Sequence, residues 1–260
     1  MEQEVKYFDR RSKIFKDQLY RIVVPMDYNR ITYKLFFYIQ QLVIYRNFDI
    51  NQKNVLDFGC GDGRWCRSLE KSNNDIIGLD INDILLNHAR NLSVSSHFFN
   101  INDFDYRDYK ESFDYIITLN TLHCIKEKEE VKKILNNFYH ILKKDGKVII
   151  MAFVAKKKNY SNLLSLSHKE WIKLYNQVGF KVEKVVNSEF LFFNHVYRFI
   201  FRLFFKKNML EYYKKKTPLT KIHEFFTMIT YFIDFIIFYP LLGRKFLVNL
   251  NWYKFYILEK

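Results

Sequence analysis

The sequence has few prolines, glycines and cysteines. Only three prolines and seven glycines occur in 260 residues, which excludes collagen-like repeats and argues against long disordered segments. The three cysteines, Cys60, Cys66 and Cys124, show neither metal-site spacing nor the even number of a disulfide framework. We therefore expect no metal and a reducing, cytoplasmic compartment. Residues 1–13 are polar and lack the apolar core of a signal peptide.

Acidic residues are scarce beside basic ones. The chain has 42 Lys and Arg against 28 Asp and Glu, a formal net charge of +14. Such a surplus suits a nucleic acid or an anionic membrane surface as partner. Because Lys, Asn, Ile, Phe and Tyr are frequent throughout, a lysine-rich background composition explains it equally well. The length suits one α/β domain with an attachment.

Three of the glycines lie in one stretch, residues 55–63, which reads V-L-D-F-G-C-G-D-G. Its apolar start predicts a buried strand that ends at Asp57. Gly59, Gly61 and Gly63 allow a tight turn and let a ligand lie against the main chain. The residues that follow predict a helix whose first amides point at this loop. A strand, a glycine turn and a helix N-terminus are typical of a nucleotide-type site.

Three further predicted strands end in polar residues. The strands cover residues 75–80, 96–101 and 113–119, and the polar residues at or after their ends are Asp80, Asp103 and Asn120. Ligands of open α/β sheets bind at the carboxyl ends of the strands. There, Asp80 is well placed to accept hydrogen bonds from both hydroxyls of a ribose. The convergence of these residues with Asp57 on one edge indicates a binding site rather than packing.

The chain alternates helices and strands up to residue 186. Helices are predicted over 30–46, 131–142 and 167–178, and further strands over 147–154 and 180–186. Ser167 and Glu170 form a capping box for the last of these helices, and Gly179 suits its end. This alternation predicts an α/β fold with a doubly wound, mainly parallel sheet.

These motifs together resemble class I S-adenosylmethionine-dependent methyltransferases, particularly the group acting on small molecules, lipids and glycans. The matching pieces are the glycine stretch, I-G-L-D-I, N-D-F, F-D-Y-I-I-T-L-N-T-L-H and I-L-K-K-D-G-K-V-I-I. They cover roughly residues 50–186 and, less strongly, the last strand. The resemblance implies a seven-stranded Rossmann-like sheet and S-adenosylmethionine as cofactor. The G-x-G-x-G spacing departs from the dinucleotide fingerprint G-x-G-x-x-G, which disfavours NAD.

The resemblance also implies which residues bind the cofactor. Those near its methionine part are Asp57, Gly59, Gly61 and Asn120. Those near its nucleoside are Asp80 at the ribose, Ile81 on the adenine face, and Asp103 at the adenine amino group with Asn102 and Phe104 beside it. Three of these residues also have a structural interpretation. Asp80 would suit a helix cap, and Asp103 and Asn120 would suit turns.

His123 is the candidate catalytic residue. It follows the fourth predicted strand, near the expected methyl group, and could act as general base on a hydroxyl. The alternative is a structural or substrate-lining role, since methyl transfer from a sulfonium needs mostly positioning, and an amine or acidic hydroxyl needs little base.

The chain departs from the minimal family pattern by about sixty residues between the sixth strand and a seventh at 252–258. We predict an N-terminal helical cap (1–48), a cofactor-binding core (49–188), a basic aromatic helical insertion (189–247) and a final strand returning to the sheet (248–260). Three interpretations of the insertion compete: a cap or dimer contact, a lid for a lipid-like acceptor that rests on anionic lipid headgroups, and a nucleic-acid face.

Within the insertion, residues 225–239 predict an apolar helix. It would be about 22 Å long, shorter than the roughly 30 Å hydrocarbon layer of a bilayer, so no transmembrane span is expected.

We predict O-methylation of a small or lipid-linked acceptor, with nitrogen or carbon as less favoured targets. The alternatives are a methyltransferase-like module that binds a membrane surface or a partner, and an RNA methyltransferase. The predicted localisation is cytoplasmic, with a peripheral membrane position as the alternative, and the sequence leaves the oligomeric state open.

Overall fold

A computed structural model describes residues 11, 30–155, 163–187, 196–197, 200, 218–238 and 253–260. The chain divides into two compact units. Unit 1 comprises residues 1–16, 48–186 and 252–260, and unit 2 comprises residues 17–47 and 187–251. Most of the predicted insertion, and most of the predicted cap before residue 30, lie outside the described residues.

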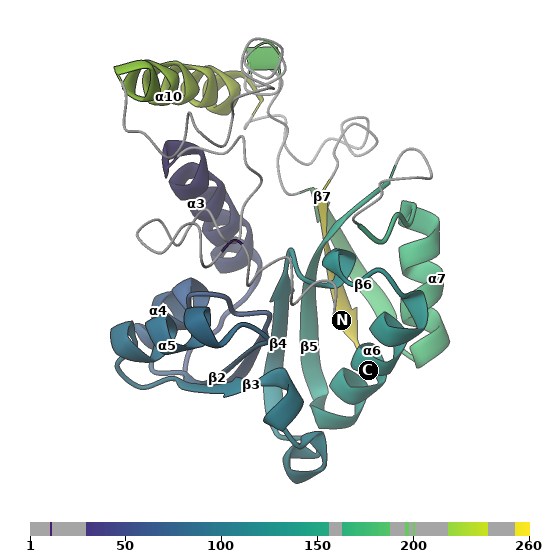
Figure 1. Ribbon diagram of the computed structural model, residues 1–260. Helices are drawn as coiled ribbons and strands as arrows, with labels where there is room; N and C mark the ends of the chain where they lie inside the picture. The colour runs from purple at the N-terminus through teal and green to yellow at the C-terminus, as the bar shows by residue number, and fades with distance from the viewer. Residues whose placement is uncertain are drawn as a thin grey trace. The chain divides into compact units, whose positions relative to one another are not determined.

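Unit 1 contains a seven-stranded sheet in the order β3-β2-β1-β4-β5-β7-β6 (Figure 1). The strands are β1 (Asn54–Phe58), β2 (Asp75–Asp80), β3 (His97–Asn100), β4 (Phe113–Leu119), β5 (Leu142–Phe153), β6 (Lys181–Asn187) and β7 (Tyr253–Glu259). Strands β1 to β5 pair in parallel, and β7 runs antiparallel to β5. The predicted fold class, a doubly wound and mainly parallel α/β sheet, is confirmed.

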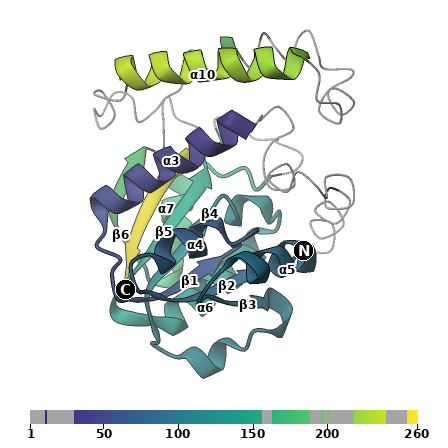
Figure 2. The ribbon, with the colours of Figure 1, turned by 90° about the vertical axis from the view of Figure 1, so that its left-hand side faces the viewer.

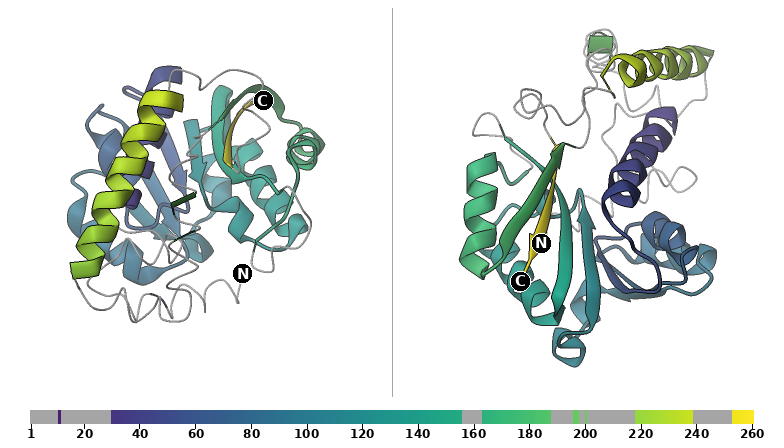
Figure 3. Two further views of the ribbon diagram at one scale, coloured as in Figure 1. Left: turned by 90° about the horizontal axis from the view of Figure 1, so that it is seen from above. Right: turned by 180° about the vertical axis from the view of Figure 1, so that it is seen from behind.

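Helices cover both faces of this sheet. They are α4 (Arg64–Glu70), α5 (Asp83–Leu92), α6 (Lys128–Ile141) and α7 (His168–Val178), with short 3₁₀ turns η1 (Ile101–Asp103), η2 (Tyr106–Tyr109) and η3 (Leu122–Cys124). Figures 1 and 3 show α4 and α5 on one face and α6 and α7 on the other. Helix α7 has the predicted capping box, and Gly179 ends it with a φ of 107°.

Strand β5 begins five residues before its predicted start at residue 147. Phe113 of β4 pairs with Leu142, whereas Tyr115 pairs with Lys147. Residues 143–146, between the predicted helix and the predicted strand, are therefore extra residues within the pairing of β4 and β5, in the manner of a bulge.

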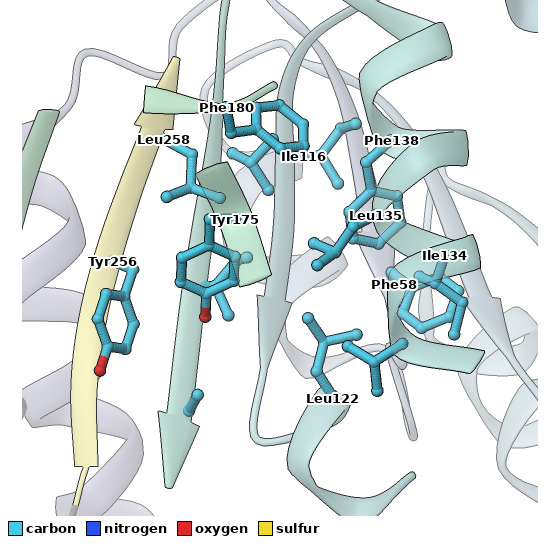
Figure 4. Packing of buried hydrophobic residues seen from close by; sticks show 14 of the residues in the cluster. Phe58, Ile116, Leu122, Ile134, Leu135, Phe138, Tyr175, Phe180, Tyr256 and Leu258 are labelled. Carbon is cyan, nitrogen blue, oxygen red and sulfur yellow. The ribbon is translucent and has the colours of Figure 1, made fainter. Parts of the chain in front are cut away.

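The main hydrophobic core lies between the sheet and helices α6 and α7 (Figure 4). Leu56 and Phe58 of β1 belong to this core, and the Phe58 ring meets Phe138 of α6 edge-on at 5.1 Å. Successive side chains of a strand point to opposite faces. Asp57, between these two residues, therefore points to the other face, where α4 contributes Cys66 beside its carboxyl group.

Unit 2 contains two long helices that pack against each other, α3 (Arg30–Asn47) and α10 (Pro218–Phe238) (Figure 2). Helix α10 begins seven residues before the predicted start at residue 225, because Pro218 suits the first helical turn, where no hydrogen-bonding N–H is needed. Within the part of the chain that the structure describes, no helix is long and apolar enough to cross a membrane.

Replacing Gly59 with alanine is expected to lower the free energy of unfolding by about 1–3 kcal/mol. An added Cβ would lie 2.1 Å from Thr121 Oγ1, and the φ of +78° at Gly59 strains any L side chain. Chemical denaturation measures the change. Asn73→Ala is the control, because Asn73 is exposed and also has a positive φ, of 52°, but already carries a Cβ. Equal losses in both variants would show that the close approach of Thr121 contributes nothing.

Candidate functional site

The glycine loop between β1 and α4 is bound to the end of β2. The backbone N–H groups of Gly59 and Cys60 both donate to the carbonyl oxygen of Leu79, at 2.7 and 2.9 Å. One residue further on, the N–H of Gly61 donates to the carboxylate of Asp80 at 2.8 Å. Gly59, Gly61 and Gly63 all have positive φ angles, of 78°, 57° and 72°. The loop can follow this path because glycine adopts these angles without steric cost.

Asp80 is held by backbone donors on both sides. Besides the Gly61 bond, its second oxygen accepts from the N–H of Asn82 at 2.9 Å. Burial raises the pKa of Asp80, although the hydrogen bonds from Asn82 and Gly61 act in the opposite direction. A carboxylate can accept about four hydrogen bonds in all, so capacity remains for the hydroxyls of a ribose. Ile81, directly after it, is only partly buried.

Asp57 is a buried carboxyl group, 2% exposed. Its oxygen accepts from the Cys66 thiol at 3.5 Å. Desolvation by burial raises the pKa of Asp57 from 3.8 to about 7, partly opposed by the Cys66 hydrogen bond and the Arg64 charge, while the Asp80 and Asp62 charges raise it further. A ligand with a positively charged amino group would favour the ionised form of this carboxyl.

Asn120, the residue after β4, has a side-chain oxygen that lacks a hydrogen-bond donor among the described residues. Asn120 adopts a left-handed φ of 65°, which Asn tolerates better than most residues. Its N–H donates to the carbonyl oxygen of Met151 at 3.0 Å. Its side-chain Oδ1 is buried and has no hydrogen-bond partner among the described residues. Such an orphaned acceptor is costly in a native protein, so it fits a donor from a bound ligand.

The end of β3 is tied to the first residue of α5 by Asn100. The Asn100 side chain accepts from the N–H of Asn102 at 3.1 Å and donates to the Asp83 carboxylate at 2.9 Å. Asn102 and Asp103 are both exposed. Phe104 instead packs into the core, where its ring stacks on Tyr109 at 4.7 Å.

His123 lies on η3 and is buried, with an exposed fraction of 3%. Its Nδ1 accepts from the N–H of Phe153 at 3.4 Å, and the ring of Tyr253 meets it edge-on at 5.7 Å. Desolvation lowers the pKa of His123 to about 4. The imidazole is therefore neutral at ordinary pH and, with Nδ1 accepting, carries its hydrogen on Nε2. Its predicted role as general base stays a prediction.

The structure thus brings together Asp57, Asp80, Asn120 and the glycine loop. Two contributors were missed in the sequence. Thr121 lies so close to Gly59 that it joins the end of β4 to the loop, and Asn100 joins the end of β3 to Asp83. Thr121 directly follows Asn120, which is the signal that could have identified it.

The site offers mainly acceptors: two buried or partly buried carboxylates and one orphaned amide oxygen. A cationic ligand with hydroxyl groups would supply the hydrogen-bond donors that these acceptors need. S-adenosylmethionine is such a ligand, because it has an ammonium group, a sulfonium and a ribose. The position of the site, at the carboxyl ends of the strands of a doubly wound sheet, is where such folds bind nucleoside ligands.

A protein-family model described as a methyltransferase domain matches residues 30–184, which is more than half of the chain. The chain therefore belongs to the class I S-adenosylmethionine-dependent methyltransferases, and S-adenosylmethionine is its cofactor. No curated protein matches the sequence.

Solved structures share the fold at low sequence identity. Phosphoethanolamine N-methyltransferase 2 of Haemonchus contortus is 15% identical, with a TM-score of 0.59, and the match covers 99% of this chain and 60% of that one. Magnesium protoporphyrin IX methyltransferase of Synechocystis is 16% identical, with a TM-score of 0.53 and 72% and 90% coverage. The PH0226 protein of Pyrococcus horikoshii is 18% identical, with a TM-score of 0.53 and 65% and 92% coverage.

The substitution Asp57→Asn is expected to stabilise the cofactor-free protein at about pH 8 by about 2–4 kcal/mol. Below pH 3.8, the ordinary pKa of an Asp carboxyl, Asp57 is protonated in both the native and the unfolded state. Between pH 3.8 and about pH 7, only the native state keeps the proton. The contribution of Asp57 to stability therefore falls as the pH rises through this window. Thermal unfolding of wild type and variant across the window measures the effect.

Asp75→Asn is the matched control, because Asp75 is exposed at the opposite end of β2. A variant at Asp57 that unfolds more easily than wild type above neutral pH would contradict the assigned burial cost.

Proposed function

We propose that the protein transfers a methyl group from S-adenosylmethionine to an acidic oxygen, such as a phenol or carboxylate, of a small or lipid-linked acceptor. The observation that carries the cofactor half of this proposal is the gathering of Asp57, Asp80 and Asn120 around the glycine loop. When bound, the cofactor supplies an electrophilic methyl group on a sulfonium.

Each residue has a distinct part in this proposal. The Asp57 carboxylate pairs with the ammonium group, and Asn120 Oδ1 accepts a hydrogen bond at the same end of the ligand. Asp80 accepts from the ribose hydroxyls while its bonds to Gly61 and Asn82 keep it in position. Asp103 and Asn102, both exposed on η1, serve the adenine end.

The proposal of an acidic acceptor oxygen rests on the weak basicity of His123. An imidazole with a pKa of about 4 is a weak proton acceptor, and its Nε2 carries a hydrogen in the geometry described. Catalysis then depends on positioning, which suits an oxygen that ionises readily and, as the alternative, an amine that needs little base. The neighbour from Haemonchus is named for methylation of an amine, which is the alternative target; its likeness to this chain is one of fold.

Asp80→Ala is expected to weaken S-adenosylmethionine binding by about 1–3 kcal/mol, because the partly buried acceptor for the ribose hydroxyls is removed. Isothermal titration calorimetry of purified protein gives the dissociation constant. Asp75→Asn, in the same strand but at the exposed opposite end, is expected to bind like wild type. Unchanged affinity in the Asp80 variant would remove it from the cofactor site.

His123→Gln is expected to slow methyl transfer less than about tenfold while the dissociation constant of the cofactor stays the same. Glutamine retains an acceptor for the Phe153 N–H, and no proton transfer is lost. A loss of about a hundredfold or more, together with a changed pH–rate profile, would instead assign His123 as the base.

The acceptor is tested by incubating the protein and labelled cofactor with matched phenols, carboxylates, aliphatic alcohols, amines and RNA, followed by mass spectrometry. Methylation confined to amines would overturn the oxygen assignment, and methylation confined to RNA would overturn the small or lipid-linked acceptor. Either result would leave the methyltransferase class intact.

A further inference from the structure

Helix α10 of unit 2 buries polar side chains. His223, Thr227, Tyr231 and Asp234 are exposed by 2%, 0%, 3% and 1%. Their spacing of four, four and three residues places them on one face of the helix. Among the described side chains of α10, the buried ones therefore carry hydroxyl, imidazole and carboxyl groups.

A contact with Tyr197 holds this face inward, and a second hydrogen bond within the helix satisfies the Thr227 hydroxyl. The Tyr197 hydroxyl hydrogen-bonds His223 Nδ1 at 2.6 Å, and the two rings stack at 5.4 Å. The Thr227 hydroxyl donates to the carbonyl oxygen of His223 at 2.7 Å. Buried polar groups are tolerated when they are hydrogen-bonded. A half-turn of the helix would expose these groups and break the bond to Tyr197.

The opposite face of α10 is apolar and exposed. We call it the α10 apolar face, and it consists of Ile222, Phe225, Phe226, Met228 and Phe232, which are 52%, 55%, 47%, 49% and 64% exposed. At 3.6 residues per turn, these side chains fall within an arc of about 160° that excludes all four buried polar residues. A helix on a water-facing surface has the reverse arrangement, and contiguous exposed apolar surface marks an interaction site.

The charge of unit 2 indicates which partner this face meets. Its residues include fourteen Lys and Arg against six Asp and Glu. Lys221 is exposed beside the face, one turn before Phe225 and two turns before Met228. A basic residue flanking an apolar helical face suits anionic lipid, since the stem lies along the apolar surface and the ammonium group reaches the headgroups.

Two other partners fit less well. A second copy of this chain would bring two units of like charge together, which opposes association. A nucleic acid would meet Ile222 and Met228, whose side chains neither stack on bases like an aromatic ring nor hydrogen-bond their edges. Lipid acyl chains accept all five side chains of the face equally.

We propose that the α10 apolar face docks on an anionic lipid bilayer, with the helix lying along the membrane surface. No described helix can span the bilayer, and the polar inward face of α10 requires contact with protein, so a position in the interface plane satisfies both faces. This interaction does not depend on methyl transfer, and its failure is separable from that of the proposed function.

The test is co-sedimentation of the full chain, without cofactor, with vesicles of phosphatidylcholine containing about a third phosphatidylglycerol, and with vesicles of phosphatidylcholine alone. We expect binding to the anionic vesicles, weakened when salt is raised from about 0.1 to about 0.5 M. The double variant Phe225→Ser with Phe232→Ser is expected to bind at least about tenfold more weakly. Both side chains are exposed, so far-ultraviolet circular dichroism and the melting temperature are expected to match those of wild type.

The control carries the same kind of change on unit 1. Leu92 and Val94 are 49% and 94% exposed, and Leu92→Ser with Val94→Ser is expected to leave vesicle binding unchanged. Equal binding by the α10 variant and wild type would overturn the proposal. A second result would also overturn the proposal: wild type does not bind vesicles, it forms dimers in light scattering, and the α10 variant does not form them. The α10 apolar face would then bind a second copy of the chain.

Discussion

The functional half of unit 1 depends on the attachment of one loop to the end of one strand. Three consecutive amides, from Gly59 to Gly61, donate to Leu79 and Asp80 at the end of β2. These bonds hold the loop against the end of β2 and orient the Asp80 carboxylate at the same time. They require backbone angles that only glycine adopts freely, and Thr121 occupies the space that a Cβ on Gly59 would take. Local conformation, packing and binding chemistry therefore share the same few residues.

The sequence was sufficient for the fold because its signals are local. Apolar runs ending in Asp or Asn predicted β2 and β4 with their observed bounds, and the capping box of α7 formed as its residues require. The placement of Asp57 on the face away from the main core follows from the period of two in a strand. The extra residues in β5 were not predictable, because their pairing depends on β4 rather than on their own composition.

The site was predictable only as a set of candidates. Strand-end position identified Asp57, Asp80 and Asn120, yet it could not show that Asp57 lies so deeply that its pKa rises to about 7. It could not separate Phe104, which stacks in the core, from its exposed neighbour Asp103. Burial of His123 against Tyr253 likewise joins two segments more than a hundred residues apart. In α10, composition indicated an apolar helix, but which face turns inward depends on Tyr197 and its bond to His223.

The location of β7 has a consequence for the order in which the molecule can assemble. Residues 253–259 form an interior strand between β5 and β6, and Lys147 pairs with Glu259. During synthesis, β1 to β5 leave the ribosome long before this partner exists, so β5 presents an unpaired edge of buried Val, Ile and Met side chains. Such non-local pairing slows folding and prolongs the exposure of aggregation-prone edges. The β5 edge therefore stays unpaired during synthesis until the residues of β7 have been made, and the sheet can be completed only after that.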